Sequence, residues 1–122
     1  MEFNVRFYYI VSEDEKPERP VLTFLERLRG TNPVLHKLLT AGIKKIETSE
    51  RHGPPLTEMV DKDNSILEIR VGDANIARAF FFFRKGQEII VTNGYVKKQQ
   101  KVDTGALELA RQYKRDWEER FP

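Results

Sequence analysis

The sequence predicts an α+β fold in the order β-α-α-β-β-β-α, in which helices pack on a small antiparallel sheet. Three segments repeat apolar residues at helical spacing, and the second and third of them flank three consecutive strand-like runs joined by glycine-containing turns. With 122 residues, of which 39% are hydrophobic, the chain is long enough for one core and short for two. We therefore expect a single domain that spans residues 1–122.

The opening segment "FNVRFYYIV", residues 3–11, is rich in β-branched and aromatic residues and predicts the first strand. The charged loop "SEDEKPE" closes it. Pro20 then suits the first turn of a helix, and Gly30 is a natural C-terminal stop. A first helix is therefore predicted between them, with apolar positions at helical spacing: Val21, Phe24, Leu25 and Leu28.

The second helix is predicted to begin at Pro33, with Asn32 as its N-cap, and to run to about Arg51, before "HGPP" ends it. Its apolar stripe follows the helical period: Leu35, Leu38, Leu39, Gly42, Ile43 and Ile46. A basic flank lies away from that stripe: His36, Lys37, Lys44 and Lys45. Such a flank can contact phosphate, but we interpret it as a solvated helix face.

The segment "TEMVDKDNS" is interpreted as a polar connector that leads into three consecutive strands, "ILEIRVGDANIARAFFFFRKGQEIIVTNGYVK". The turns "GDA" and "KG" each hold a glycine, which tolerates the unusual backbone angles of a hairpin. The four consecutive phenylalanines indicate a strand that is buried on both faces. A third helix follows Lys101, with Asp103 or Thr104 as its cap. Its apolar stripe comprises Ala106, Leu109, Ala110, Tyr113 and Trp117.

Composition excludes several kinds of site. The chain has no cysteine, which rules out disulfides, thiolate zinc sites and a cysteine nucleophile. His36 and His52 have no neighbouring carboxylate pattern, so we predict neither a bound metal nor another cofactor. The 21 Lys+Arg residues against 19 Asp+Glu leave a net charge of only +2, so overall charge does not indicate a polyanionic partner. The N-terminal segment has no basic leader and no long apolar span, which predicts a cytoplasmic protein without a signal peptide or membrane helix.

Strand alternation predicts which side chains share a face of the sheet. If "GDA" is a three-residue loop, Arg70 lies opposite Ile76 and shares a face with Arg78. If "KG" is a two-residue loop, Arg78 lies opposite Asn93. One face of the sheet then holds a polar set: Arg70, Arg78, Asn93, Tyr95 and Lys97. The other face holds an apolar core: Leu67, Ile69, Val71, Ala77, Ala79 and Phe81.

The stretch "NGYVKKQQK" leaves this face through an aromatic residue and three lysines, Lys97, Lys98 and Lys101. The lysines suit a cationic concavity begun by the two arginines, although a polar linker before a helix would have the same composition. Clustered cations repel one another, so an arrangement without a function should contain more carboxylates than Glu68. The last helix is expected to cover the apolar, turn-end part of this face: Phe80, Phe82, Ile89 and Val91. The open end is predicted to be a groove for a phosphodiester, with a base stacked on Tyr95.

Three stretches carry a resemblance to a known family. "LEIRVGDANIARAFFFF", "IIVTNGYVKKQQK" and the helix ending in "RDWEERF" resemble the RelE/ParE toxin superfamily, and within it the phage-derived HigB-like branch of type II toxin-antitoxin systems. The resemblance covers residues 64–121 by motif and the first half by pattern alone. It implies a compact α+β toxin that cuts mRNA without a metal, often on the ribosome, and that a helix-turn-helix antitoxin holds inactive. The implied reaction is attack of the ribose 2′-hydroxyl on the adjacent phosphate, which leaves a 2′,3′-cyclic phosphate and a 5′-hydroxyl.

The resemblance also assigns roles to individual positions. Arg70 and Arg78 match strand arginines that would hold the scissile phosphate and its developing negative charge. Lys97 would protonate the leaving group or stabilise its charge. The predicted RNA-binding residues are Lys98, Lys101 and Asn93.

The general base stays open among three residues. Tyr95 or Tyr113 could orient or deprotonate the hydroxyl, but a phenol with a pKa of about 10 is a poor base unless nearby cations lower it. Glu68 could be the base or an ion-pair partner of Arg70, and we favour the ion pair. No histidine lies near the predicted site.

Two other functions remain open on the same scaffold. Some members of the superfamily poison DNA gyrase instead of cutting RNA, and fold alone does not separate the two activities. A catalytically inactive nucleic-acid-binding regulator would need only a phosphate-binding groove. The aromatic-x-Lys-Lys exit from the last strand favours the nuclease.

Overall fold

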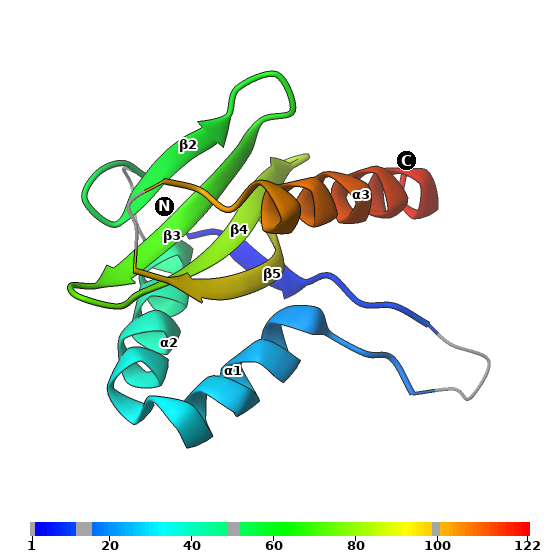
Figure 1. Ribbon diagram of the computed structural model, residues 1–122. Helices are drawn as coiled ribbons and strands as arrows, with labels where there is room; N and C mark the ends of the chain where they lie inside the picture. Colours follow the sequence, from blue (N-terminus) through cyan, green and yellow to red (C-terminus); the bar gives the residue numbers. More distant parts are fainter. Residues whose placement is uncertain (1, 12–15, 49–51, 99–100) are drawn as a thin grey trace.

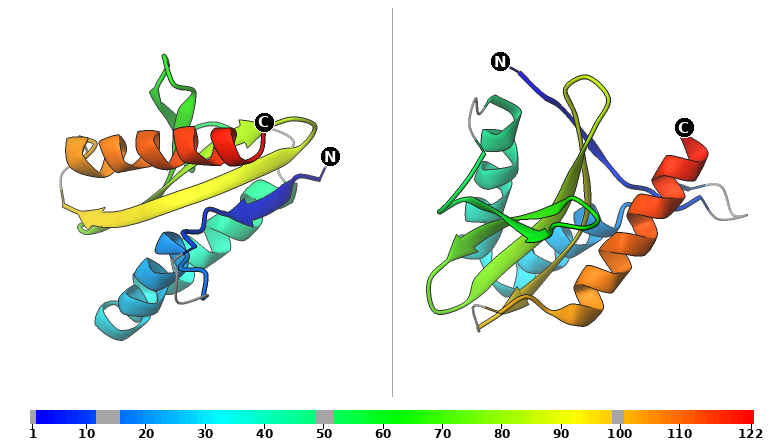
Figure 2. Two further views of the ribbon diagram at one scale, coloured as in Figure 1. Left: turned by 90° about the vertical axis from the view of Figure 1, so that its right-hand side faces the viewer. Right: turned by 90° about the horizontal axis from the view of Figure 1, so that it is seen from above.

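The computed structural model describes residues 2–11, 16–48, 52–98 and 101–122, and within them the protein is α+β, with three helices and a five-stranded sheet (Figure 1). Helices α1 and α2 lie against one face of the sheet and α3 lies against the other (Figure 2). The elements are β1 (Asn4–Phe7), α1 (Pro20–Thr31), α2 (Pro33–Thr48), β2 (Thr57–Asp61), β3 (Ile66–Gly72), β4 (Ile76–Arg84), β5 (Glu88–Lys97) and α3 (Thr104–Arg120).

The sheet has the order β1-β5-β4-β3-β2, and it is not wholly antiparallel. Strands β2 to β5 pair antiparallel, but β1 pairs parallel with β5, which corrects the predicted antiparallel sheet. The segment predicted as a connector contains β2, so the order of elements has one more strand than predicted. β2 is an edge strand held by its backbone bonds to β3, and its side chains do not alternate clearly between apolar and polar.

The first strand is shorter than predicted. β1 pairs with residues 88–91 of β5, and the Tyr8 N–H donates one more hydrogen bond to the Val91 carbonyl (2.9 Å). The chain then leaves the sheet, and Ile10 makes a separate bridge with Glu18. The predicted strand was too long because its aromatic and β-branched residues continue past the point where pairing with β5 ends.

Two predicted helix caps are confirmed. Asn32 Oδ1 accepts from the Leu35 N–H (3.2 Å), and Asp103 Oδ1 accepts from the Ala106 N–H (2.9 Å). α1 runs through Gly30 to Thr31, so this glycine lies in the last turn and does not end the helix. The end of the second helix, predicted near residue 51, falls outside the described residues. Among the helices of the described part, none is long and apolar enough to cross a membrane.

The three-strand meander is confirmed, but the register differs from the prediction in both of its strand pairs. Gly72 pairs with Ile76, so the first loop has the expected length of three residues but comprises residues 73–75, one position later than the predicted "GDA". Arg84 pairs with Glu88, so the second turn has three residues where two were predicted. Farther along, a bulge in β5 opposite Phe80 shifts the pairing once more.

The longer turn places the residues of β5 that follow it on the opposite sheet faces from those predicted. Ile90 packs with Phe82 and Trp117 beneath α3, whereas Ile89 and Val91 belong to the core under α1 and α2. The prediction that Ile89 and Val91 share the polar face was therefore wrong, because it assumed a two-residue turn and no bulge.

The core under α1 and α2 contains all six residues that alternation assigned to it: Leu67, Ile69, Val71, Ala77, Ala79 and Phe81. Under α3, Trp117 is fully buried and Leu107 is buried in place of Leu109, which is 37% exposed. Phe83 is also exposed, at 41%, so β4 is buried on both faces only as far as Phe82.

Candidate nucleic-acid site on the sheet

A row of polar side chains crosses four strands on the sheet face that α3 partly covers. Glu58 of β2 lies opposite Glu68 of β3, and Arg70 of β3 lies opposite Arg78 of β4. Arg78 in turn lies opposite Tyr95 of β5. Because directly opposed residues of antiparallel strands project from the same face, these five side chains form one continuous row, which we call the charged row.

Two details of this row differ from the predicted register. Arg70 faces Arg78 directly, where Ile76 had been predicted, and Arg78 faces Tyr95, where Asn93 had been predicted. Each pairing is shifted by two residues. Between β3 and β4 the loop lies one position later than predicted, and between β4 and β5 the longer turn and the bulge each add one residue. The predicted face therefore survives although the predicted partners do not.

Glu68 joins the two arginines of the charged row. Its Oε1 lies 3.3 Å from Arg78 Nη1 and 3.4 Å from Arg70 Nε. Arg70 also pairs through Nη1 with Glu58, a residue that the sequence analysis missed because it assigned this segment to a connector. The predicted ion pair of Glu68 with Arg70 is thus present, and Arg78 shares the same carboxylate.

The centre of the row is shielded from solvent. Arg78 is 0% exposed and Glu68 is 1% exposed. Burial raises the pKa of Glu68 because it disfavours the charged form, and the two arginines oppose that shift. The centre of the row is therefore a buried carboxyl group, Glu68, with a raised pKa and ion pairs to two guanidinium groups.

Tyr95 lies beside Arg78 on β5. Its ring stacks on Phe80 with centroids 5.6 Å apart, and the Arg78 guanidinium carbon lies 5.7 Å from the ring centroid. The Tyr95 hydroxyl accepts a hydrogen bond from the Asp103 N–H (3.0 Å), which ties the ring to the start of α3. Burial raises the pKa of Tyr95, so this phenol stays protonated at neutral pH and is a poor candidate for the general base.

Asn93 lies on the predicted face, but its side chain is occupied. The residue is 5% exposed, and its Nδ2 donates to the Ala106 carbonyl (3.1 Å) while its Oδ1 accepts from the Thr92 hydroxyl (2.8 Å). Asn93 therefore anchors α3 to β5, and the described structure gives it no surface for RNA.

Lys97 lies on the face of the charged row, and Lys98 and Lys101 follow it along the chain. Lys97 is half-buried at the end of β5, opposite Ile76 and two residues beyond Tyr95, so alternation places it on the same face. Lys98 and Lys101 are exposed. Within residues 2–11, 16–48, 52–98 and 101–122, none of these lysines forms an ion pair, so they are the positive charges of this region that no carboxylate neutralises there.

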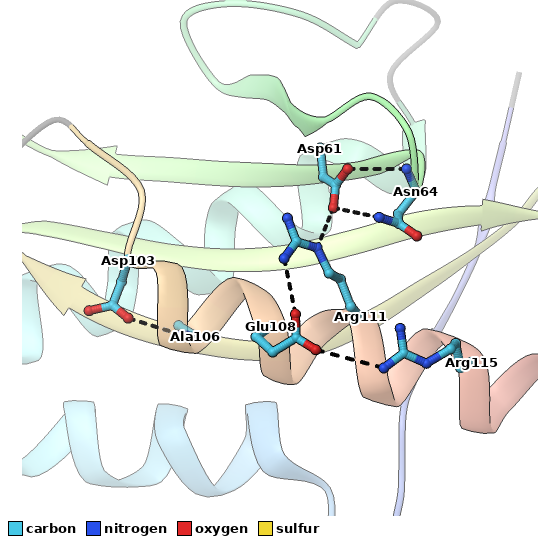
Figure 3. Close-up of polar contacts among 7 residues, drawn as sticks. All are labelled: Asp61, Asn64, Asp103, Ala106, Glu108, Arg111 and Arg115. Carbon is cyan, nitrogen blue, oxygen red and sulfur yellow. Dashed lines mark hydrogen bonds and ion pairs between the residues drawn. The ribbon is translucent and has the colours of Figure 1, made fainter.

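An ionic cluster fastens α3 over the other end of this face (Figure 3). The Asp61 carboxylate accepts from Arg111 Nε (2.5 Å), from Asn64 Nδ2 (2.9 Å) and from the Asn64 N–H (3.1 Å). Arg111 also binds Glu108 (3.0 Å), which lies 3.7 Å from Arg115. Burial alone would raise the pKa of Asp61, but the hydrogen bonds from Arg111 and Asn64 outweigh it and hold the pKa below its ordinary value.

Tyr113 and the histidines lie away from the charged row. The Tyr113 ring stacks on Tyr8 with centroids 4.3 Å apart, and burial raises its pKa. His52 packs between Phe3 and Phe83, and a ring nitrogen lies 3.1 Å from the Ile46 carbonyl. In the part of the chain that the structure describes, no group of three His, Cys, Asp or Glu side chains is placed to hold a metal ion.

The sheet, its three helices and the strand-borne charged row define a small α+β protein with a polar row across one sheet face. The family model described as "Phage derived protein Gp49-like (DUF891)" matches residues 26–115, so the chain belongs to this phage-derived, toxin-like family, which is part of the RelE/ParE-like toxin superfamily. The matched part contains the whole charged row and all three lysines. A search of curated proteins finds no match to this chain.

Proposed function

We propose that this protein is the toxin of a type II toxin-antitoxin system and that it cuts mRNA, on the ribosome, as a metal-independent endoribonuclease. The observation that supports it best is the charged row itself, in which Arg70, Glu68, Arg78 and Tyr95 share one sheet face with Lys97. Guanidinium groups suit a phosphate because their forked N–H groups match its oxygens. Membership of a toxin-like family fits this activity.

The proposed reaction is an internal transfer. A base removes the proton of the ribose 2′-hydroxyl, the 2′-oxygen forms a bond to the adjacent phosphorus, and the bond from phosphorus to the 5′-oxygen breaks. The departing 5′-oxygen takes a proton, so the products are a 2′,3′-cyclic phosphate and a 5′-hydroxyl. Arg70 and Arg78 stabilise the charge that builds on the phosphate, and Lys97 donates the proton to the 5′-oxygen.

Glu68 is the best candidate base among the residues of the row. Its pKa is raised by burial, which brings a carboxyl group nearer to the pH at which general bases work well. Its Oε2 is buried and accepts no hydrogen bond within the described part of the chain, so this oxygen is placed to accept a proton. Tyr95 suits the task less, because burial raises a pKa that is already too high.

The burial of Arg78 and Glu68 sets a condition on this function. A phosphodiester reaches them only when neighbouring side chains move aside. We propose that the Tyr95 ring, which lies next to the Arg78 guanidinium, is the part that moves, and that its movement breaks the bond between the Tyr95 hydroxyl and the Asp103 N–H. RNA binding at Lys97 and Lys98 would offset the cost of that opening.

The same burial favours a second candidate, a nucleic-acid-binding regulator without catalysis. In that case Arg78 and Glu68 only stabilise the sheet, while Lys97, Lys98 and Lys101 bind phosphate. A gyrase poison is the third candidate, and it would act through its helices. For all three we propose a helix-turn-helix antitoxin as the inhibitor, as the superfamily resemblance implies.

One experiment separates these functions. Purified protein is incubated with RNA, with and without ribosomes and with a chelator present, and both the ends of the products and the supercoiling activity of gyrase are measured. New 5′-hydroxyl ends with 2′,3′-cyclic phosphates support the nuclease, and their loss in Arg78→Lys assigns them to this site. Binding of RNA without new ends supports the regulator, and inhibition of gyrase without new ends supports the poison.

A further inference from the structure

An open cleft borders the outer end of the charged row. It has a volume of about 440 Å³, which is in the range of sites for small ligands. Two chemically different parts form its wall: an apolar part from two prolines and aliphatic side chains, and a polar part from the side chains of one ion pair. The lining residues are Pro54, Pro55, Thr57, Glu58, Arg70, Val71, Gly72 and Ile76.

The polar part of the cleft is the outermost ion pair of the row. The Arg70 side chain is 21% exposed and the Glu58 side chain 50% exposed, in contrast to the buried Glu68 and Arg78. Arg70 is held in place from two sides, by Glu58 and by Glu68. The cleft is therefore bordered by an ion pair and not by a single positive charge. It presents a hydrogen-bond donor and an acceptor side by side next to an apolar surface.

We propose that this cleft is a subsite for a guanine base of RNA, a proposal that rests on the proposed function. A base has flat apolar faces, which Pro54, Pro55 and Ile76 can contact, and a polar edge, which an ion pair can read. Guanine offers its O6 and N7 acceptors to a guanidinium and its N1 and N2 donors to a carboxylate. Uracil has no acceptor equivalent to N7 beside its O4 and no amino group, so it matches Arg70 and Glu58 less fully.

The position of the cleft suits a nucleotide whose phosphate lies over the charged row. Glu58 is on β2 and Arg78 is on β4, two strands away, and strands lie about 4.8 Å apart, so the two positions are about 10 Å apart across the sheet. One nucleotide spans a distance of this order between its base edge and its phosphate. A phosphate over Arg78 and Lys97 would therefore leave its neighbouring base at Glu58.

Binding can be measured without cleavage. The probes are two fluorescently labelled tetranucleotides, one with four uracils and one in which a single uracil is replaced by guanine. Both carry 2′-O-methyl groups, so they lack the 2′-hydroxyl nucleophile and cannot be cut. Fluorescence anisotropy with the full chain gives each dissociation constant. We expect the guanine probe to bind about tenfold more tightly than the uracil probe, and Glu58→Gln to remove that difference.

Glu26→Gln is the matched control. Glu26 also forms an exposed ion pair with an arginine, Arg29, but it lies on α1, away from the cleft. We expect Glu26→Gln to keep the tenfold preference. In a second measurement on isotope-labelled protein, guanosine 5′-monophosphate should shift the amide resonances of Glu58, Arg70 and Gly72 more than uridine 5′-monophosphate does.

The outcomes separate this proposal from the nuclease. Equal affinity for the two probes, or a guanine preference that survives Glu58→Gln, overturns the guanine subsite even if the protein cuts RNA. A guanine preference that depends on Glu58, in a protein that cuts no RNA with or without ribosomes, supports the subsite and overturns the nuclease. If guanosine 5′-monophosphate shifts only resonances from other parts of the chain, the base binds elsewhere and the cleft is not its site.

Discussion

Glu68 and Arg78 form an ion pair that solvent scarcely reaches: Oε1 and Nη1 lie 3.3 Å apart, and the side chains are 1% and 0% exposed. Taking both charges out of water costs more than their attraction returns unless further bonds compensate, and Arg70 supplies one of them. Such a pair adds little stability compared with apolar side chains of similar size. Its position at the centre of the charged row is therefore better explained by function than by stability.

Removing one partner of this pair should destabilise the fold strongly. In Glu68→Ala the Arg78 guanidinium loses its carboxylate in a buried place, and we expect the free energy of unfolding to fall by about 3–5 kcal/mol. The double variant Glu68→Met with Arg78→Met should be closer to the wild type than Glu68→Ala is, because the buried guanidinium is removed together with its carboxylate. Urea unfolding followed by the fluorescence of Trp117 measures both changes, and a double variant less stable than Glu68→Ala would contradict this account.

The Asp61–Arg111 bond should make stability depend on pH at the acidic end. The pKa of Asp61 is lowered in the folded protein, so its contribution is present above the unfolded pKa of about 3.9 and is lost as the pH falls through the folded value. Asp61→Asn should therefore be less stable than the wild type at pH 6, and the difference should shrink as the pH falls below about 4. Unfolding curves at a series of pH values test this, and a constant difference would show that ionisation of Asp61 is not the cause.

Glu68 should give the opposite dependence, because its pKa is raised in the folded protein. Its contribution is fully present below the unfolded pKa of about 4.3 and is lost as the pH rises through the folded value. Relative to Glu68→Gln, the wild type should thus lose stability as the pH rises from about 4. The same unfolding series measures it. If the wild type instead gains stability relative to Glu68→Gln as the pH rises, the two arginines outweigh burial and lower the pKa of Glu68.

Much of the fold could be predicted from local patterns, and the exceptions have a common cause. Helical spacing and caps located α1, α2 and α3, and alternation located β3, β4 and β5 with their core face. The edge strand β2 and the parallel pairing of β1 are set by backbone bonds to distant segments, which leave little trace in the side-chain pattern. The bulge in β5 is likewise a property of the pairing and not of either strand alone.

The candidate site could be predicted as a face but not as a set of contacts. Alternation correctly placed Arg70, Arg78, Tyr95 and Lys97 on one side of the sheet. It missed Glu58, because that residue joins the row only through β2, and it could not reveal that Asn93 is occupied by α3. Burial of Arg78 depends on how α3 and Tyr95 cover the sheet, which is a tertiary property that one strand does not encode.

The close contact between α1 and β5 should require a glycine at position 94. A Cβ atom there would lie 2.6 Å from the Arg78 carbonyl oxygen and 2.6 Å from Phe24 Cδ2, so Gly94→Ala should destabilise the fold by about 1–3 kcal/mol. Gly30→Ala is the control. Apart from its chain neighbours and the helix backbone, no atom of the described residues lies within 4 Å of its Cβ position, and alanine in a helix should stabilise by about 0.5–1 kcal/mol. Thermal unfolding compares the two. Adding Phe24→Ala to Gly94→Ala should not restore stability, because the clash with backbone remains.

Lys97 offers the sharpest test of the proposed chemistry, because its contribution to stability should be small. It is half-buried and forms no ion pair within the described residues, so Lys97→Ala should leave the unfolding midpoint nearly unchanged. If Lys97 protonates the departing 5′-oxygen or stabilises its charge, the cleavage rate should fall about a hundredfold or more. Lys45→Ala, which removes an exposed lysine from α2 on the opposite side of the sheet, should keep the wild-type rate. Single-turnover cleavage with ribosomes present measures all three proteins, and equal rates for Lys97→Ala and the wild type would exclude Lys97 from the reaction.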